Sequence, residues 1–379
     1  MMRKRNIVIR SLVFLFCLVF SLSIFSNALA AEKYKNFPVP KECMDQVRKE
    51  GSQLNIYDWA EWWPEELFKN FSKEFGVKVV RDHFADTEEM VTKIKLNPKV
   101  PYDLVTGSGP TDAVRLNGMK LLQKINHAWI PNYDAYIMDQ FKNVDFDPGN
   151  QFQVVDSIFL TTYTYNSKFI DPNDKHIGSW KALFDGAAKY KGKFTMIDNQ
   201  YEAIGTALKY LGYSWTTDNK DELMQARDVL MKQKPYVMAY DSWPRRLLVE
   251  EEAWMSHLWV GDGWLLSADA PTMRGVVPEE GTYIAGNTDF IPIGSKHPAT
   301  AHLFINYLFR TDVNALLVGW IGYPPAHKHV MELMSDKMKA WPGFVLDPEY
   351  IKKCDGFNER MITGKGQEIR AKIWEELKK

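Results

Sequence analysis

The stretch Leu54-Asn-Ile-Tyr-Asp-Trp-Ala-Glu-Trp-Trp-Pro64 predicts a strand that runs directly into a helix. Acidic and aromatic side chains stand between the two elements: Asp58, Trp59, Glu61, Trp62 and Trp63. In an open α/β sheet, ligands bind beyond the carboxyl ends of the strands. A carboxylate flanked by indole rings suits an organic cation, because both groups attract positive charge. The alternative is that the tryptophans belong to the core and that Glu61 only favours the start of the helix.

Strands and helices alternate on the C-terminal side of this stretch. A helix is predicted to start at Pro64 and to be closed by Gly76, because the apolar residues between them recur at helical spacing. Strands are predicted at 77–80 and 102–106, and the helix between them starts at a capping box formed by Asp86 and Glu89. This order predicts an α/β fold with a mainly parallel sheet and helices on both of its faces.

The chain of 379 residues is too long for one comfortable core and is predicted to form two lobes. The segment 151–166 is long, β-branched and aromatic, which indicates a strand that connects the lobes. The segment 282–292 is predicted to cross back. The expected parts are an N-terminal extension (31–52), a first lobe (53–157 plus 288–327) and a second lobe (158–287 plus 328–379), with hinge strands near 155–162 and 284–290.

Residues 1–30 have the three parts of a secretory signal peptide. A basic start precedes an apolar run over 11–25 and a small-residue cleavage signal at 28–30. The run is shorter than the roughly 20 apolar residues of a membrane-spanning helix. We therefore expect cleavage near Ala30 and a soluble protein exported to the periplasm.

Cleavage would change the charge of the chain. The first thirty residues hold four basic and no acidic side chains, so their removal takes the formal net charge from −1 to −5. A nucleic-acid partner would require a basic surface, so this class of function is not expected. A negative net charge is compatible with a cationic ligand but does not identify one.

Two cysteines follow the signal peptide, Cys43 and Cys354, near opposite ends of the mature chain. In an oxidising compartment such a pair favours a disulfide between the N-terminal extension and the C-terminal helices. Two free thiols are the alternative. The sequence contains no CxxC or zinc-ligand spacing, so neither a metal nor a cofactor is expected.

Short motifs are spread over nearly the whole mature chain. They are Asp58-Trp-Ala-Glu-Trp62, Phe75-Gly-Val-Lys-Val79, Tyr102-Asp-Leu-Val105, Ser179-Trp-Lys-Ala-Leu183, Trp259-Val-Gly-Asp262, Phe304-Ile-Asn-Tyr-Leu308 and Ile321-Gly-Tyr-Pro324. In order and spacing they resemble the periplasmic spermidine/putrescine-binding proteins, the solute-binding components of ABC importers. The resemblance implies a two-lobed type II periplasmic-binding fold that closes on a polyamine by a hinge motion. It also implies a monomer without enzymatic activity that delivers its ligand to an inner-membrane permease.

The resemblance also implies the residues of the ligand site. Trp59 would lie along the methylene chain of a polyamine, and Glu61 would pair with a terminal ammonium. Glu202 and Asp262 would supply carboxylates from the second lobe, the latter from 258–264, which predicts a strand that passes into a glycine turn. Further contacts are expected from Trp62, Ser108, Trp259 and Tyr323.

Two amides depart from the pattern of these relatives. Asn199 stands where the polyamine binders usually place an acid, and Asn287 stands where an aspartate is usual. On the same strand Ala285 replaces an aromatic residue, and the usual Trp-Gly pair is absent from 156–161. A pocket with about three acids instead of four suits a diamine, or a monocation with a polar tail, better than a triamine.

Two other functions compete with cation binding. The turn Thr106-Gly-Ser-Gly-Pro-Thr111 before a helix would form a backbone nest for an anion such as a phosphonate, with Arg245 and Arg246 as cationic partners. A zwitterion such as an amino acid or an opine would use both an acid and an arginine. The sequence contains no nucleophile elbow, which argues against a hydrolytic enzyme. The pair His327-x-His329 follows a Pro-Pro turn and has no further candidate metal ligand nearby in the sequence, which argues against a catalytic metal site.

Overall fold

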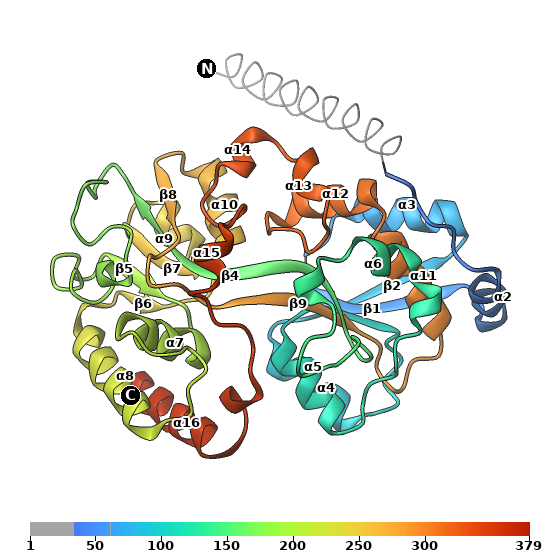
Figure 1. Ribbon diagram of the computed structural model, residues 1–379, viewed down its shortest axis with the longest axis horizontal. Coiled ribbons are helices and arrows are strands. Elements are labelled where there is room, and N and C mark those ends of the chain that lie inside the picture. The colour runs from blue at the N-terminus through green and yellow to red at the C-terminus, as the bar shows by residue number, and fades with distance from the viewer. Residues whose placement is uncertain (1–33, 61) are drawn as a thin grey trace, which may run out of the picture.

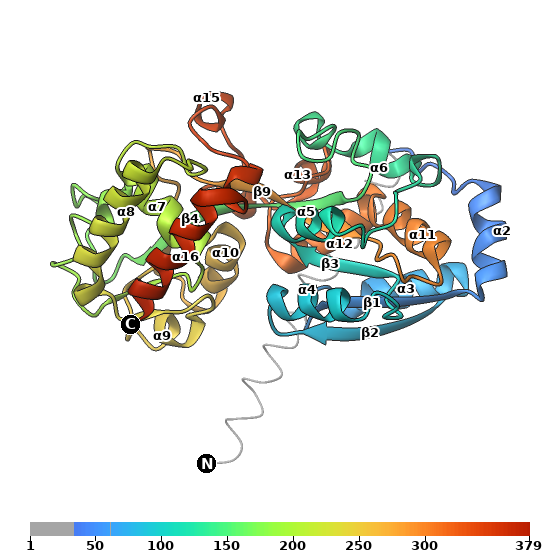
Figure 2. The same cartoon turned by 90° about the horizontal axis from the view of Figure 1, so that it is seen from below.

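The computed structural model describes residues 34–60 and 62–379. The expected signal peptide and Glu61 lie outside the described residues. The described chain forms two lobes joined by two strands, β4 (Val154–Asn166) and β9 (Ile284–Phe290), which cross from one lobe to the other (Figure 1). The view from below shows the same division (Figure 2). This is the two-lobed α/β architecture that the sequence predicts.

Strands and helices alternate in both lobes, as expected. The other strands are β1 (Gln53–Trp59), β2 (Lys78–Phe84), β3 (Leu104–Ser108), β5 (Phe194–Met196), β6 (Ala239–Tyr240), β7 (Met255–Trp259) and β8 (Met273–Val276). The helices are α2 (Lys41–Glu50), α3 (Glu65–Phe75), α4 (Thr87–Leu96), α5 (Pro110–Gly118), α6 (Pro131–Tyr136), α7 (Gln200–Tyr210), α8 (Lys220–Gln233), α9 (Arg245–Val249), α10 (Val260–Asp269), α11 (Pro298–Leu308), α12 (Thr311–Ile321), α13 (Val330–Leu333), α14 (Asp336–Lys339), α15 (Pro348–Ile351) and α16 (Gly364–Lys378).

The strands follow the order β2-β1-β3-β9-β4-β7-β5-β6, with β8 paired to β4. Strands β1, β2 and β3 are parallel in one lobe, and β5, β6 and β7 are parallel in the other. The crossing strands are antiparallel to their neighbours, with Ser108 aligned with Thr288 and Trp259 aligned with Thr161. The carboxyl ends of β3 and β7 therefore meet the crossing strands, where a ligand site is expected.

Local sequence signals explain where helices α3 and α4 begin and end. Helix α3 buries Leu67, Phe68 and Phe71 on one face and ends at Gly76, whose φ of 66° suits glycine. Helix α4 begins where the Asp86 carboxylate accepts a hydrogen bond from the backbone N–H of Glu89 at 2.8 Å. Both predicted helices are confirmed.

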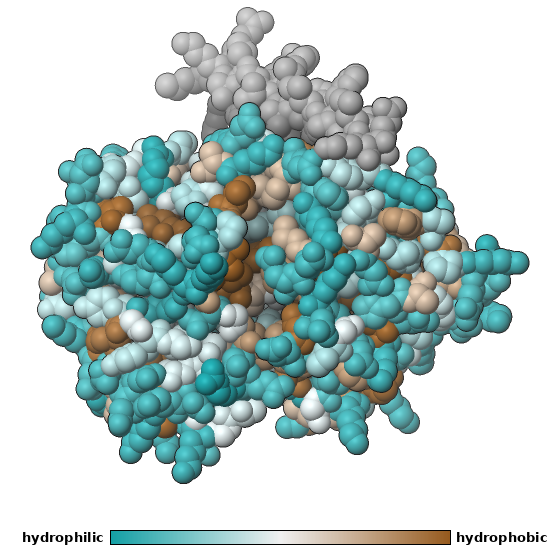
Figure 3. All heavy atoms as spheres, in the orientation of Figure 1, coloured by the Kyte–Doolittle hydropathy of each residue, from teal (hydrophilic) through white to brown (hydrophobic). Residues whose placement is uncertain are grey.

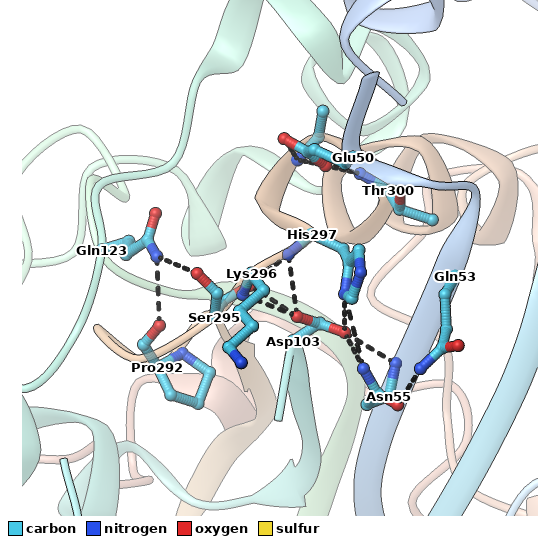
Figure 4. A network of polar contacts seen from close by, with 11 residues as sticks. Glu50, Gln53, Asn55, Asp103, Gln123, Pro292, Ser295, Lys296, His297 and Thr300 are labelled. Carbon is cyan, nitrogen blue, oxygen red and sulfur yellow. Dashed lines mark hydrogen bonds and ion pairs between the residues drawn. The ribbon is translucent and has the colours of Figure 1, made fainter. Parts of the chain in front are cut away.

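A buried carboxylate organises the outer end of the sheet (Figure 4). Asp103, at the start of β3, accepts hydrogen bonds from the backbone and side-chain N–H groups of Asn55 at 2.8 and 2.6 Å, and from the backbone N–H of His297 at 3.0 Å. Glu50, at the end of α2, accepts from the backbone N–H groups that begin α11 at 3.0 to 3.3 Å. These bonds fasten the segment before α11 to β1 and β3, so the network is structural.

The predicted disulfide is wrong, because both cysteines are free. The Cys43 thiol lies 3.6 Å from the carbonyl oxygen of Ala299, and the Cys354 thiol lies 3.5 Å from that of Tyr350. Helix α2, which carries Cys43, lies at the far end of the first lobe, while Cys354 follows α15 near the junction of the lobes (Figure 1). Cellular compartment indicates whether a disulfide can form, but it contains no information on the distance between two thiols.

A reductant should therefore leave the melting temperature of the mature protein unchanged. A disulfide typically stabilises by about 2–4 kcal/mol, and its loss would lower the melting temperature by several degrees. The measurement is a thermal melt with and without dithiothreitol, together with a thiol titration in denaturant that should find both cysteines reduced. A marked destabilisation by dithiothreitol would contradict the free thiols.

Candidate ligand-binding site

Side chains from both lobes meet beside the crossing strands. Trp62, in the turn between β1 and α3, lies edge-on to Tyr323, with ring centroids 5.5 Å apart. Tyr323 follows α12, and its hydroxyl donates a hydrogen bond to Asp262 of α10 at 2.8 Å. In the space-filling view, the surface between the lobes is hollowed and carries apolar side chains, whereas most of the rest of the visible face is hydrophilic (Figure 3).

Asp262 occupies the first turn of α10, which begins directly after β7. The predicted glycine turn over 258–264 is therefore wrong. Gly261 lies inside the helix, and a Cβ atom added there would lie 2.1 Å from the Tyr323 ring. The glycine serves close packing instead of a turn, because only a residue without a side chain lets the tyrosine ring approach the helix.

Glu202 is held by groups of the second lobe and of the crossing strand. Its carboxylate accepts hydrogen bonds from the Thr161 hydroxyl at 2.5 Å and from the Trp259 indole N–H at 3.3 Å. The helix that carries it is capped by Asn199, whose side-chain oxygen accepts from the backbone N–H groups of Tyr201 and Glu202 at 2.8 and 3.3 Å. The oxygen of the predicted ligand residue Asn199 is therefore already used as a helix cap.

Burial makes the charges of the two acids costly. It raises the pKa of Glu202 to about 7 and the pKa of Asp262 to about 7. Burial, together with these two neighbouring acids, also raises the pKa of the Tyr323 hydroxyl well above its usual value. Among the residues that the structure describes, no arginine or lysine pairs with Glu202 or Asp262. An ammonium group between them would supply the missing charge and form strong hydrogen bonds.

The loop after β3 holds the two tryptophans of the first lobe. The Trp59 indole donates a hydrogen bond to the carbonyl oxygen of Gly107 at 2.8 Å, and its ring lies edge-on to Phe84 at 4.7 Å. Gly107 has a φ of +70°, and a Cβ atom there would lie 2.9 Å from both the Trp59 and Trp62 side chains. Only glycine satisfies both the backbone angle and the close approach.

Two further predicted contacts have partners within the protein. The Ser108 hydroxyl donates to the carboxylate of Asp112 at 3.1 Å. The Asn287 amide donates to the hydroxyl of Ser157 at 3.0 Å. Asp58, which also belongs to the opening stretch, is fully buried and paired with Arg81 at 2.6 Å, so its role is structural.

The arginines and the histidine considered for competing functions have other partners. Arg245 pairs with Asp269 at 2.5 Å, and Arg246 pairs with Glu250 and Glu252 at 2.7 Å, all on the surface around α9. His327 is buried and stacks on Tyr136. Within residues 34–60 and 62–379, no three histidine, cysteine, aspartate or glutamate side chains cluster as metal ligands.

Sequence reasoning missed the polar residues of the crossing strands that support the site. Thr161 orients Glu202, and Ser157 contacts Asn287. Two fully buried acids, Asp156 and Asp289, lie on the same strands. In the sequence these residues appear only as polar positions in β-branched segments, and only the register of β4 against β9 places them beside the site.

The sequence profile described as "Bacterial extracellular solute-binding protein" matches residues 66–345. The chain belongs to this family. The solute-binding protein is 30% identical over 327 residues to the spermidine/putrescine-binding periplasmic protein of Salmonella typhimurium, covering 86% of this chain and 91% of that relative. It is 29% identical over 331 residues to the protein of the same name from Escherichia coli, covering 87% and 92%.

Solved structures share the fold of this chain. The spermidine/putrescine ABC transporter substrate-binding protein of Streptococcus pneumoniae is similar in fold, with a TM-score of 0.77 at 23% identity, and the match covers 86% of this chain and 99% of that one. The predicted resemblance and fold class are confirmed. Members of this family bind and carry solutes, so this protein is a carrier and not an enzyme. None of the described helices combines the length and apolar character needed to cross a membrane.

Proposed function

We propose that the solute-binding protein captures a small organic cation, most simply a polyamine of the putrescine or spermidine type. The observation that supports this proposal is a pair of buried acids, Glu202 and Asp262, with no cationic partner among the described residues and with aromatic rings beside them. Ammonium groups satisfy such carboxylates, and methylene groups pack on indole and phenol rings. The names of the relatives point to the same class of ligand.

The proposed contacts come from both lobes. Glu61, Glu202 and Asp262 would receive the ammonium groups, and Trp59 and Trp62 would cover the chain between them. Further contacts would come from Ser108, Asn199, Trp259, Asn287 and Tyr323. Three charge-assisted bonds of about 2 kcal/mol each, with burial of the methylene groups at about 0.8 kcal/mol each, are of the size that micromolar affinity requires.

The proposed setting is an ABC importer. The lobes, with the boundaries given by the sequence, would close on the ligand about the hinge strands β4 and β9. The protein would be exported after cleavage near Ala30, act as a periplasmic monomer and deliver its ligand to an inner-membrane permease. The S. pneumoniae relative is named as a substrate-binding protein of an ABC transporter, which supports this setting.

The test is a thermal-shift screen of the mature, ligand-stripped protein against putrescine, cadaverine, spermidine, spermine, agmatine, amino acids and aminoethylphosphonate, followed by calorimetry. A ligand at a hundred times its dissociation constant stabilises by about 2.7 kcal/mol, so a true ligand should raise the melting temperature clearly. We expect a diamine to give the largest shift. A shift by a zwitterion or a phosphonate, without one by any polyamine, would overturn the proposal.

A further inference from the structure

Asn287 is joined to a buried acid by a short chain of hydrogen bonds. Its side-chain N–H donates to the hydroxyl oxygen of Ser157 at 3.0 Å, and the Ser157 hydroxyl donates to the carboxylate of Asp156 at 2.5 Å. A serine hydroxyl has one proton to donate. Because that proton goes to Asp156, the oxygen of Ser157 must accept from Asn287. The nitrogen of the Asn287 amide is therefore directed toward Ser157, and its oxygen is directed away.

A second buried acid lies on the strand beside Asp156. Asp289 aligns with Val154, two residues from Asp156, on the neighbouring strand, and both carboxyls are fully buried. Burial raises the pKa of Asp156 to about 7, and burial beside Asp156 raises the pKa of Asp289 well above its usual value. Each carboxyl is therefore neutral over more of the pH range than an ordinary aspartate. Asp156 accepts from Ser157 in either protonation state, because a protonated carboxyl carries its proton on one oxygen only and the other oxygen still accepts.

Asn287 lies on the crossing strand β9, aligned with Ser157 of β4. Asn287 as a whole residue is 8% exposed, and no described residue donates a hydrogen bond to its side-chain oxygen. Ser157 also forms a backbone bridge with Pro325, two residues after Tyr323, so the chain of bonds lies against the loop that carries the aromatic side of the site. A free amide oxygen at this place is a neutral acceptor for an N–H group of a ligand.

We propose that Asp156 and Ser157 are positioning residues that turn the oxygen of Asn287 toward the cleft, where it accepts a hydrogen bond from a ligand amine. This inference rests on the proposed function and specifies which ligand group the side chain at position 287 recognises. This orientation of the amide selects against a ligand carboxylate or phosphonate at this position. Two hydrogen-bond acceptors that face each other cannot form a hydrogen bond. An acid at position 287 would need no such support, since both oxygens of a carboxylate accept.

This difference between an amide and a carboxylate gives the test. Calorimetry with putrescine and spermidine is carried out on the mature protein, Ser157→Ala, Asn287→Asp and the double variant. Without Ser157 the amide is free to present its N–H₂ group to the ligand, so Ser157→Ala should weaken binding about fivefold, the equivalent of one hydrogen bond. In the Asn287→Asp background, the same substitution should change affinity less than twofold.

A matched control separates positioning from the general loss of a buried hydroxyl. Ser256 is also fully buried on a strand and bonds to Thr195, away from this chain of bonds. Ser256→Ala should destabilise the protein without changing affinity. An equal loss of affinity on Ser157→Ala in both backgrounds, or no loss with Asn287 present, overturns the positioning role alone. A wild-type protein that binds no polyamine overturns the proposed function, and the role of Asn287 with it.

Discussion

Replacing Glu202 by glutamine should weaken the binding of a diamine by about 2–3 kcal/mol, or roughly 30- to 150-fold. The carboxylate is buried and keeps its place through Thr161 and Trp259, so the change removes the charge while leaving the shape of the side chain nearly unchanged. The loss falls on a charge-assisted hydrogen bond to an ammonium group, which is stronger than a neutral one. Calorimetry on the mature variant measures it.

The same substitution should stabilise the ligand-free protein at alkaline pH. Burial raises the pKa of Glu202 from 4.5 to about 7. Since the folded state binds the proton more tightly than the unfolded state, the free energy of unfolding falls as the pH rises from about 4.5 to 7, and stays low above that. Glutamine cannot ionise, so the variant should be more stable than wild type by about 3 kcal/mol at pH 8 and by less than about 1 kcal/mol at pH 5.

Glu368→Gln is the matched control for both measurements, because this glutamate is exposed on α16. It should bind and unfold as the wild type does. If Glu202→Gln bound diamines as tightly as the control, Glu202 would not contact the ligand. If its stability relative to wild type were independent of pH, the carboxyl would not be titrating near neutrality.

Gly261→Ala adds a single methyl group and should reduce stability and ligand binding more than any other such addition in the site. A Cβ atom at this position would lie 2.1 to 2.6 Å from three atoms of the Tyr323 ring. The ring would have to move, and its hydrogen bond to Asp262 and its edge contact with Trp62 would be lost with it. Overpacking and a buried acid without its partner together should cost about 3 kcal/mol of stability and should weaken ligand binding.

Gly319→Ala is the control for this change. Gly319 also lies in a helix, α12, but a Cβ atom there would meet no atom within 4 Å. Because alanine is the better helix former, this variant should be slightly more stable than wild type and should bind normally. Thermal melts and calorimetry compare the two. Removing the ring with Tyr323→Ala should abolish most of the penalty of Gly261→Ala, and full additivity of the two changes would contradict the clash.

Much of the architecture follows from local signals. The alternation of strands and helices, the start of α3 after Pro64 and the cap at Asp86 depend on residues close together in the chain. The acids and aromatic residues of the site were also visible, because they stand at the ends of strands, where an α/β fold gathers its ligand contacts. The comparisons with relatives confirm the family that these motifs predict.

The two incorrect predictions, the disulfide and the glycine turn, depend on distances between residues that a local sequence pattern does not contain. Cys43 and Cys354 are both free thiols, so the predicted disulfide does not form. Gly261 is required by the close approach of the Tyr323 ring and not by a turn.

The sequence by itself determined the two-lobed fold, the family and most of the acids and rings proposed to receive the ligand, since periodicity and motif order are local properties. Only the tertiary structure decided what each polar group does. Asn199 caps a helix, while Asn287 donates to Ser157, which in turn donates to Asp156 on the neighbouring crossing strand. The direction of a hydrogen bond depends on the partners that folding brings together, and those partners lie up to 130 residues apart in the chain.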